Sequence, residues 1–323
     1  MPRSQAIRII NVPSDVGSMI KGKSLAPEAF QAAELAGKLT KVGYDVEDIN
    51  ALPDGPRVWT FDAEISENGV RNEEANVEVN RRVEEAVSRV LQTDSDTPPF
   101  PLIVGGECNI VPAILSAFWN TNTLQGKTIG LLYLDGDCDL TIPNEPWASY
   151  NLASMTFTHL TMREGALESM KPFTRPDGRG VCDAGNTVLF GLNAALQGNT
   201  RPQLAYLFDE GYRVFTSSSV ARNPVGAAEE ALAWFEAQGV DCFLLHLDVD
   251  AIDATLFPLA NVGNRTGVGF EGVLAAVRTF LGSRRCGGLC VAEVNPDHDP
   301  GGVMVGALVE ELVGGFEGRV EMG

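Results

Sequence analysis

Carboxylates follow an apolar run of this sequence at alternate positions. Residues 129–134 are mostly apolar and long enough for a strand buried on both faces, and Asp135, Asp137 and Asp139 begin where that run stops. Alternate residues of an extended backbone point to one side. Three acids on one side repel each other strongly unless a cation lies among them, so this stretch predicts a bound divalent metal ion.

A second stretch repeats the pattern. Residues 241–253 contain an apolar run that turns acidic at its end, and His246, Asp248 and Asp250 would share a face of an extended backbone. For either stretch alone, an acidic loop after a strand is the alternative interpretation. Two independent stretches favour a metal site.

The composition excludes two classes of partner. The 323 residues, 44% of them hydrophobic, can bury a large core. The chain has 24 Lys and Arg against 43 Asp and Glu, a formal net charge of −19. Such a surface repels nucleic acid and anionic membranes and attracts a cationic small molecule. We therefore expect a small-molecule ligand, no nucleic acid and no membrane partner.

The cysteines and the lack of long apolar runs indicate the compartment. The six cysteines are scattered, without CxxC pairs or the density of a small secreted protein. No apolar stretch approaches the length of a membrane span. We expect a soluble protein of the cytoplasm.

Strand-like and helix-like segments alternate along the chain. This alternation predicts an α/β protein with a mostly parallel sheet covered by helices on both faces, in one domain over residues 1–323. The expected strands are 6–12, 102–104, 129–134, 187–192, 212–216, the run before Asp248 and 288–292, and the expected helices are 27–37, 72–91, 110–119, 203–208, 226–238, 272–281 and 302–316.

Ligands of such a fold bind beyond the carboxyl ends of the strands. Residues from four expected strands fall there: Cys108, Asp135, Asp137, Asp139, Asp248, Asp250 and Glu293. A site needs this convergence, and chance seldom supplies it. Gly105 and Gly106 precede Cys108 at a strand-to-helix turn, where glycine serves either a bound ligand or close helix packing.

Four segments together resemble the motifs of the arginase and agmatinase (ureohydrolase) family, which are GGDH, DAHxD, SxDxDxxDP and ExNP. In the family's order and spacing, they are Gly105-Gly106-Glu107-Cys108, Asp135-Gly136-Asp137-Cys138-Asp139, residues 246–253 and Glu293-Val294-Asn295-Pro296. Ala26-Pro27 and Gly267-Val268-Gly269 also fit, so the resemblance covers nearly the whole chain. It implies a three-layer α/β/α sandwich with a mostly parallel sheet of about eight strands.

The resemblance also implies two Mn²⁺ ions bridged by a hydroxide that attacks a guanidinium carbon. By position in the motifs, Asp135 and Asp248 would bridge the two ions, Cys108 and Asp139 would complete the first site, and Asp137 and Asp250 would complete the second. Asp253 would hold the bridging hydroxide, and Glu293 would pair with the guanidinium group of the substrate.

Two metal-binding histidines of the family are replaced, by Cys108 and Asp137. A thiolate ligand shifts preference from Mn²⁺ toward Zn²⁺ or another softer ion. The more negative ligand set makes bound water less acidic. A buried thiol that binds nothing is the alternative for Cys108.

The substrate-facing motifs depart as well. The family's proton-shuttling histidine falls on Ala153, and the acids that help to hold the amino group of arginine fall on Asn193-Ala194-Ala195. Free arginine in its usual pose is therefore not the expected substrate.

His246 stands at the serine position of the third motif and should face the metals. Three interpretations stay open: a replacement ligand, a replacement acid or base, or a histidine that supports a ligand by a hydrogen bond. His159 and His298 are expected to be solvated loop residues near the mouth of the site.

The sequence thus favours a metal-dependent hydrolase of linear C–N bonds, of amidinohydrolase type, acting on a modified guanidino compound such as an N-hydroxy- or N-substituted guanidine. The alternative is a protein of this fold that has lost catalysis and serves as a binding or regulatory subunit, which Ala153 and the missing histidines motivate. The resemblance implies a homo-oligomer, a trimer or hexamer.

Overall fold

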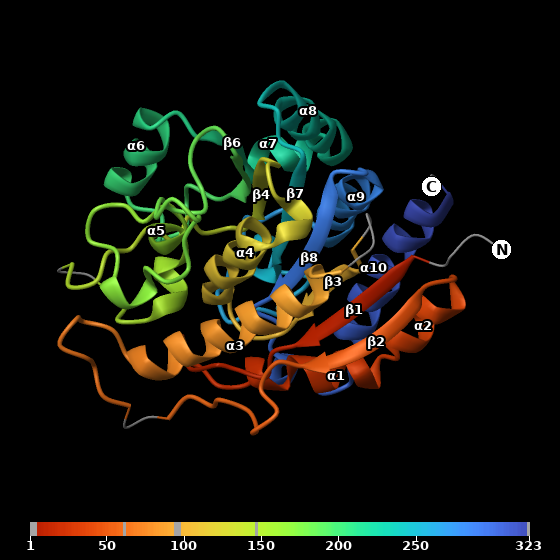
Figure 1. Cartoon of the computed structure of the whole chain (residues 1–323), viewed down its shortest axis with the longest axis horizontal. Helices are drawn as coiled ribbons and strands as arrows, with labels where there is room; N and C mark the ends of the chain where they lie inside the picture. Colours follow the sequence, from red (N-terminus) through yellow and green to blue (C-terminus); the bar gives the residue numbers. More distant parts are fainter. Residues whose placement is uncertain (1–4, 61–62, 94–97, 146–147, 322–323) are drawn as a thin grey trace.

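The structure, a computed structural model, describes residues 5–60, 63–93, 98–145 and 148–321. At its centre is an eight-stranded sheet with all neighbouring strands parallel, in the order β2-β1-β3-β8-β7-β4-β5-β6 (Figure 1). The strands are β1 (Ala6–Asn11), β2 (Asp45–Asn50), β3 (Phe100–Val104), β4 (Ile129–Leu134), β5 (Thr187–Leu192), β6 (Arg213–Thr216), β7 (Cys242–Asp248) and β8 (Cys286–Ala292).

Alternate side chains of the central strands enter two separate cores. In β4, Leu132 and Leu134 pack in the core on one face of the sheet, whereas Leu131 and Tyr133 pack in the core on the other. Every residue of β4 and β7 is buried. Strands covered on both faces need apolar residues at nearly every position, which explains the continuous apolar runs in the sequence.

Helices form the two outer layers (Figure 1). Among the described residues they are α1 (Ala26–Ala32), α2 (Leu35–Lys41), α3 (Glu73–Leu91), α4 (Val111–Asn120), α5 (Thr156–Thr161), α6 (Arg201–Asp209), α7 (Ser217–Arg222), α8 (Pro224–Ala237), α9 (Phe270–Gly282) and α10 (Val303–Glu321). The core on the Tyr133 face includes side chains of α3, α4, α5 and α6, and the other core includes those of the remaining helices. The expected α/β/α sandwich is confirmed.

Two elements differ from the sequence-based expectation. The sequence does not predict β2, because Val46 and Ile49 are its only apolar residues and they do not alternate. It is an edge strand, where charged side chains protect the open edge from pairing with other chains. The single helix expected at 27–37 is two helices, because Glu34 takes a left-handed φ of 62° between α1 and α2.

Gly105 and Gly106 turn the chain at the end of β3, and both have positive φ angles, 93° and 73°. A Cβ atom on Gly105 would lie 2.7 Å from Cδ of Pro27 in α1. Of the two roles considered for these glycines, close helix packing accounts for Gly105.

One expected loop histidine is instead buried. His159 lies within α5, and its Nε2 accepts a hydrogen bond from the backbone N–H of Leu167 at 3.2 Å. Burial lowers the pKa of His159 to about 4, so it is a neutral core residue. The expectation of a solvated loop residue is wrong for His159. His298 is exposed, as expected, although it is the last residue of a short 3-10 helix, Pro296–His298. Within the described ranges, no helix has both the length and the hydropathy to span a bilayer.

Candidate metal centre

The predicted site residues lie at the carboxyl ends of four neighbouring strands. Strands β3, β8, β7 and β4 are adjacent in the sheet, and Cys108, Glu293, Asp248 and Asp135 lie at or just beyond their respective ends. Parallel strands bring their carboxyl ends to one edge, so residues far apart in the sequence meet there.

The aspartates are oriented by backbone N–H groups. Asp135 Oδ1 accepts a hydrogen bond from the N–H of Asp137 at 2.6 Å, and Asp248 Oδ1 accepts one from Asp250 at 2.8 Å. Asp250 Oδ1 accepts one from the N–H of Gly136 at 3.0 Å, which ties the β7 loop to the β4 loop. The alternation of acids in the sequence therefore becomes two cross-linked acidic turns.

Asp139 accepts a hydrogen bond from an aromatic side chain of β4. It has a left-handed φ of 46°, and its Oδ2 accepts a hydrogen bond from the hydroxyl of Tyr133 at 2.5 Å. The ring of Tyr133 stacks on the imidazole of His246 with centroids 4.8 Å apart. Both rings belong to fully buried strands.

Without a cation, burial and mutual repulsion disfavour the ionised forms of these aspartates. Burial, together with the neighbouring carboxylates, raises the pKa values of Asp135, Asp139 and Asp248 well above the ordinary range. For the same reasons the pKa of Asp250 is raised to about 7. A divalent cation among these groups would reverse the effect, since it favours the ionised form.

Ligand atoms also gather at distances that suit an ion. Among the described residues, two groups of three have ligand atoms within 4.8 Å of one another: Cys108, Asp248 and Glu293, and Asp135, His246 and Asp248. Asp135 Oδ2 is buried and has no hydrogen-bond partner within the described chain. Buried oxygen atoms without partners are rare in proteins, and a bound cation would satisfy this one. The donor set therefore fits divalent metal ions.

A cavity of about 190 Å³ opens onto this cluster. Of the predicted site residues, its lining contains Cys108, Asp137, Asp139, Asp248, Asp250 and Glu293. Three predicted residues are not in the lining: Asp135, His246 and Asp253. Asp253 instead caps the following turn, where its Oδ1 accepts a hydrogen bond from the N–H of Thr255 at 2.8 Å.

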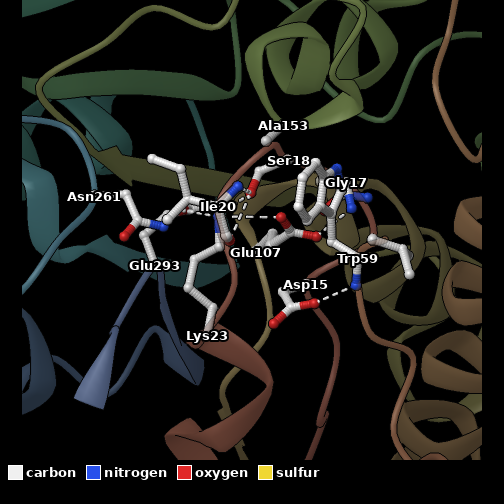
Figure 2. Close-up of polar contacts among 12 residues, drawn as sticks. Asp15, Gly17, Ser18, Ile20, Lys23, Trp59, Glu107, Ala153, Asn261 and Glu293 are labelled. Atoms are coloured by element: carbon white, nitrogen blue, oxygen red, sulfur yellow. Dashed lines mark hydrogen bonds and ion pairs between the residues drawn. The ribbon is translucent and has the colours of Figure 1, made fainter. Parts of the chain in front are cut away.

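Sequence reasoning missed the most unusual residue of the cavity wall, Lys23. Its side chain is only 1% exposed, and its ammonium lies 3.1 Å from Glu107 Oε1, 3.0 Å from Glu293 Oε2 and 2.6 Å from Ser18 Oγ (Figure 2). Burial alone would lower the pKa of Lys23, but the two carboxylates outweigh it and raise the pKa. No local signal marks this lysine, because both carboxylates come from distant parts of the chain.

Glu293 is held in an unusual backbone conformation. Its φ is 62°, and its N–H donates to the carbonyl of Gly106 at 3.1 Å. Its Oε1 accepts a hydrogen bond from the N–H of Cys108 at 3.2 Å. Non-glycine residues with left-handed backbone cost free energy and cluster at functional sites, so this conformation supports a functional role for Glu293.

This geometry agrees with a comparison of the sequence with known families. The model of the arginase family matches residues 5–314. The chain belongs to the arginase family.

Known members of the arginase family match nearly the whole chain. Arginase of Staphylococcus aureus (strain MRSA252) is 27% identical over 309 residues, which cover 93% of each chain. The native structure of Bacillus caldovelox arginase at pH 5.6 matches with a TM-score of 0.82 and 22% identity, covering 99% of this chain and 98% of that one. Proclavaminate amidino hydrolase from Streptomyces clavuligerus matches with a TM-score of 0.70 and 19% identity, covering 100% of this chain and 94% of that one.

Arginase-family membership makes the protein a metal-dependent hydrolase of C–N bonds, of the amidinohydrolase type. The low identities mark it as a divergent member.

Cys108 is buried beside the acids and bonded as a thiol. Its Sγ lies 3.3 Å from the carbonyl of Ala153 and accepts a hydrogen bond from the hydroxyl of Thr156 at 3.2 Å. Burial and the surrounding carboxylates raise the pKa of Cys108 well above its ordinary value. As for the aspartates, only a cation would make the anionic form favourable here.

Residues 193–195, which lack the acids that would bind an amino group, are held by hydrogen bonds within the fold. The amide nitrogen of Asn193 donates to Asn264 Oδ1 at 2.6 Å and Thr266 Oγ1 at 2.8 Å, and its Oδ1 accepts from the N–H of Ala195. The cavity lining includes Ala153 but none of the residues 193–195. Ala153 brings no group that could carry a proton.

Proposed function

We propose that the protein is a metal-dependent amidinohydrolase acting on a modified guanidino compound, such as an N-hydroxy- or N-substituted guanidine. The observation that carries the proposal is the convergence of the acidic cluster and Glu293 on one cavity. In this proposal the metal centre forms the floor of the cavity, and Glu293 binds the amidino group on its wall.

We propose the ligand assignment that family position implies. Asp135 and Asp248 would each help to hold both ions, Cys108 and Asp139 would complete one site, and Asp137 and Asp250 would complete the other. Two divalent ions, when bound, supply Lewis acidity and make water a nucleophile at neutral pH. Mn²⁺ is the family's ion, and Cys108 favours Zn²⁺ or a softer ion. The role of Asp253 in holding the attacking oxygen stays a prediction.

The reaction consumes one water molecule. Its oxygen forms a bond to the central amidino carbon, and the bond from that carbon to the substituted nitrogen breaks. Of the two protons of the attacking water, one goes to the departing amine and the other to the imino nitrogen that stays on the carbon. An N-hydroxyguanidine that carries an alkyl group on another nitrogen would thus yield the alkylamine and hydroxyurea.

Two features disfavour an unmodified guanidinium substrate. Lys23 already places a cation 3.0 Å from Glu293, so a guanidinium group must share that carboxylate with an ammonium. Asn193 lies in the segment where an arginine-binding member would carry acids, and its amide instead forms hydrogen bonds within the fold. Arginine and agmatine should therefore be poor substrates.

The experiment compares hydrolysis of arginine, agmatine and their N-hydroxyguanidine counterparts by the metal-loaded protein, with urea, hydroxyurea and amine as readouts. We expect release from an N-hydroxyguanidine at least about tenfold faster than from arginine. Urea release from arginine at rates ordinary for an arginase would contradict the substrate proposal. No release from any amidino compound by a fully metal-loaded protein would favour the binding or regulatory alternative.

We further propose that the protein acts in the cytoplasm as a homo-oligomer, a trimer or hexamer, with residues 1–323 folding as one domain. The acidic surface supports a cationic small molecule as the ligand.

A further inference from the structure

His246 is a fully buried histidine whose ring has no hydrogen bond. Its exposure is 0%, and neither Nδ1 nor Nε2 has a partner among the described residues. A buried polar group left without a partner costs about 1–3 kcal/mol, and buried histidines therefore usually donate or accept. The partner of this histidine should therefore lie outside the described residues.

The missing partner would lie between two atoms that face each other. His246 Nε2 is 3.9 Å from Asp135 Oδ2, which is the other unpartnered ligand atom of the cluster. That separation is too long for a hydrogen bond. Two ligands about 2.1 Å from one ion lie about 3.0–3.4 Å apart at octahedral to tetrahedral angles. The gap therefore fits an ion after a movement of only about 0.5–0.9 Å.

The strand holds the imidazole in this position. In the sheet register, His246 of β7 pairs with Tyr133 of β4 and Cys290 of β8. The Tyr133 ring stacks on the imidazole at an interplanar angle of 26°. Because alternate residues of a strand share a face, Asp248 lies on the same side as His246. A ligand fixed by central strands loses little conformational freedom on binding an ion.

These contacts decide among the three interpretations of His246. A proton shuttle must reach substrate or water, but His246 does not line the cavity and is not exposed. A supporting histidine would have to donate a hydrogen bond to a ligand, and Nε2 makes none at 3.9 Å from Asp135 Oδ2. A bound ion would instead satisfy both of these unpartnered atoms at once. A metal ligand needs only an unpartnered ring nitrogen that faces the other ligands.

We propose that His246 is a metal ligand, binding through Nε2 to the ion shared with Asp135 and Asp248. The chain thereby supplies an imidazole ligand from inside strand β7, whereas the histidine positions of the family's first two motifs hold Cys108 and Asp137. The proposal rests on the metal centre of the proposed function but not on its substrate or its catalytic rate.

The test uses the full chain loaded with cadmium-113 and labelled with nitrogen-15 at histidine. His159, His246 and His298 are the three histidines of the chain, so the spectrum is simple. We expect a scalar coupling between cadmium and one ring nitrogen, which disappears in His246→Asn. The matched control His298→Asn, at an exposed position, should keep the coupling.

Affinity gives a second readout that does not depend on the spectrum. In competition with a chelator, His246→Asn should bind the more weakly bound of its cadmium ions with an affinity reduced by more than about a hundredfold. Loss of a residue that only supports a ligand usually reduces metal affinity by about 10–100-fold. His298→Asn should bind as the parent protein does. If His246→Asn fails to fold, His246→Gln gives the same comparison.

Cadmium bound with no coupling to any histidine, or bound with parental affinity by His246→Asn, would overturn the proposal. The same experiments distinguish a failure of the His246 proposal from a failure of the proposed function. A metal-loaded enzyme that cleaves guanidino compounds without a histidine ligand would refute only the role of His246, and a coupled but inactive protein would refute only the activity.

Discussion

Two groups of buried carboxylates lie at the carboxyl end of the sheet, and they balance their charge differently. Glu107 and Glu293 share the ammonium of Lys23, a cation that the chain itself provides. Asp135, Asp139, Asp248 and Asp250 face one another, and within the described chain no lysine or arginine forms an ion pair with them. A lysine of the chain therefore neutralises the glutamates, whereas the aspartates need a bound cation.

The difference teaches where to look for a missing ligand. Burial raises the pKa values of Glu107, Asp135 and Asp248, but only at Glu107 does a fixed positive charge, that of Lys23, oppose the rise. Acids that stay together without a cation destabilise the fold, and such a cluster persists where an ion is bound. The comparison can be tested by replacing Lys23 and by measuring stability at several pH values with and without metal.

The largest expected effect on stability comes from Lys23→Met. Removing one partner of a buried ion pair leaves the other charge uncompensated and costs about 3–5 kcal/mol of unfolding free energy. Urea unfolding of the metal-loaded protein measures this loss. The exposed Lys21→Met is the matched control and should change stability by less than about 0.5 kcal/mol.

A double variant shows whether charge is the cause. In Lys23→Met/Glu107→Gln one of the two carboxylates that lost their ammonium is gone, so at least about 1 kcal/mol should be regained. Equal stability of Lys23→Met and Lys21→Met would show that the ammonium does not stabilise these carboxylates and would remove the contrast between the two groups.

A smaller effect is expected from pH. The folded pKa of Asp250 is about 7, above the ordinary value near 4, so between these values the metal-free folded state holds more protons than the unfolded state. Stability of the metal-free protein should therefore fall as pH rises from about 4 to 7. Metal displaces those protons, so the gain in Tm on adding metal should grow over the same range, by at least about 2 °C.

Thermal unfolding with and without chelator at several pH values measures that gain. A gain that is constant or shrinks between pH 5 and pH 7.5 would mean that protons and metal do not compete for the acidic group.

The sequence predicts the acidic group and not the Lys23 group, for a physical reason. Asp135 and Asp248 follow apolar runs directly, so strand periodicity and the geometry of parallel sheets place them together. Lys23 directly follows Gly22, and it is paired with carboxylates that lie just beyond the ends of β3 and β8. Local pattern carries no information on such a distant pairing.

The same limit applies elsewhere. Alternation along β7 predicts that His246 faces the acids, but only the three-dimensional structure shows its unpartnered nitrogens and its absence from the cavity wall. The sequence misses β2 because an edge strand needs few apolar residues, and it misplaces His159 because a six-residue helix has little periodicity to detect. The assignment of each ligand to one of two metal sites stays a prediction.

The central claim is that the acidic group holds divalent metal ions, and metal content tests it most directly. Protein purified without chelator should contain about two divalent ions per chain by elemental analysis, as the two-metal assignment requires. Asp248→Ala, which removes a carboxylate that the proposal assigns to both ions, should contain almost none while remaining folded by circular dichroism. A folded parent protein without metal, or an Asp248→Ala variant with full metal content, would contradict the claim.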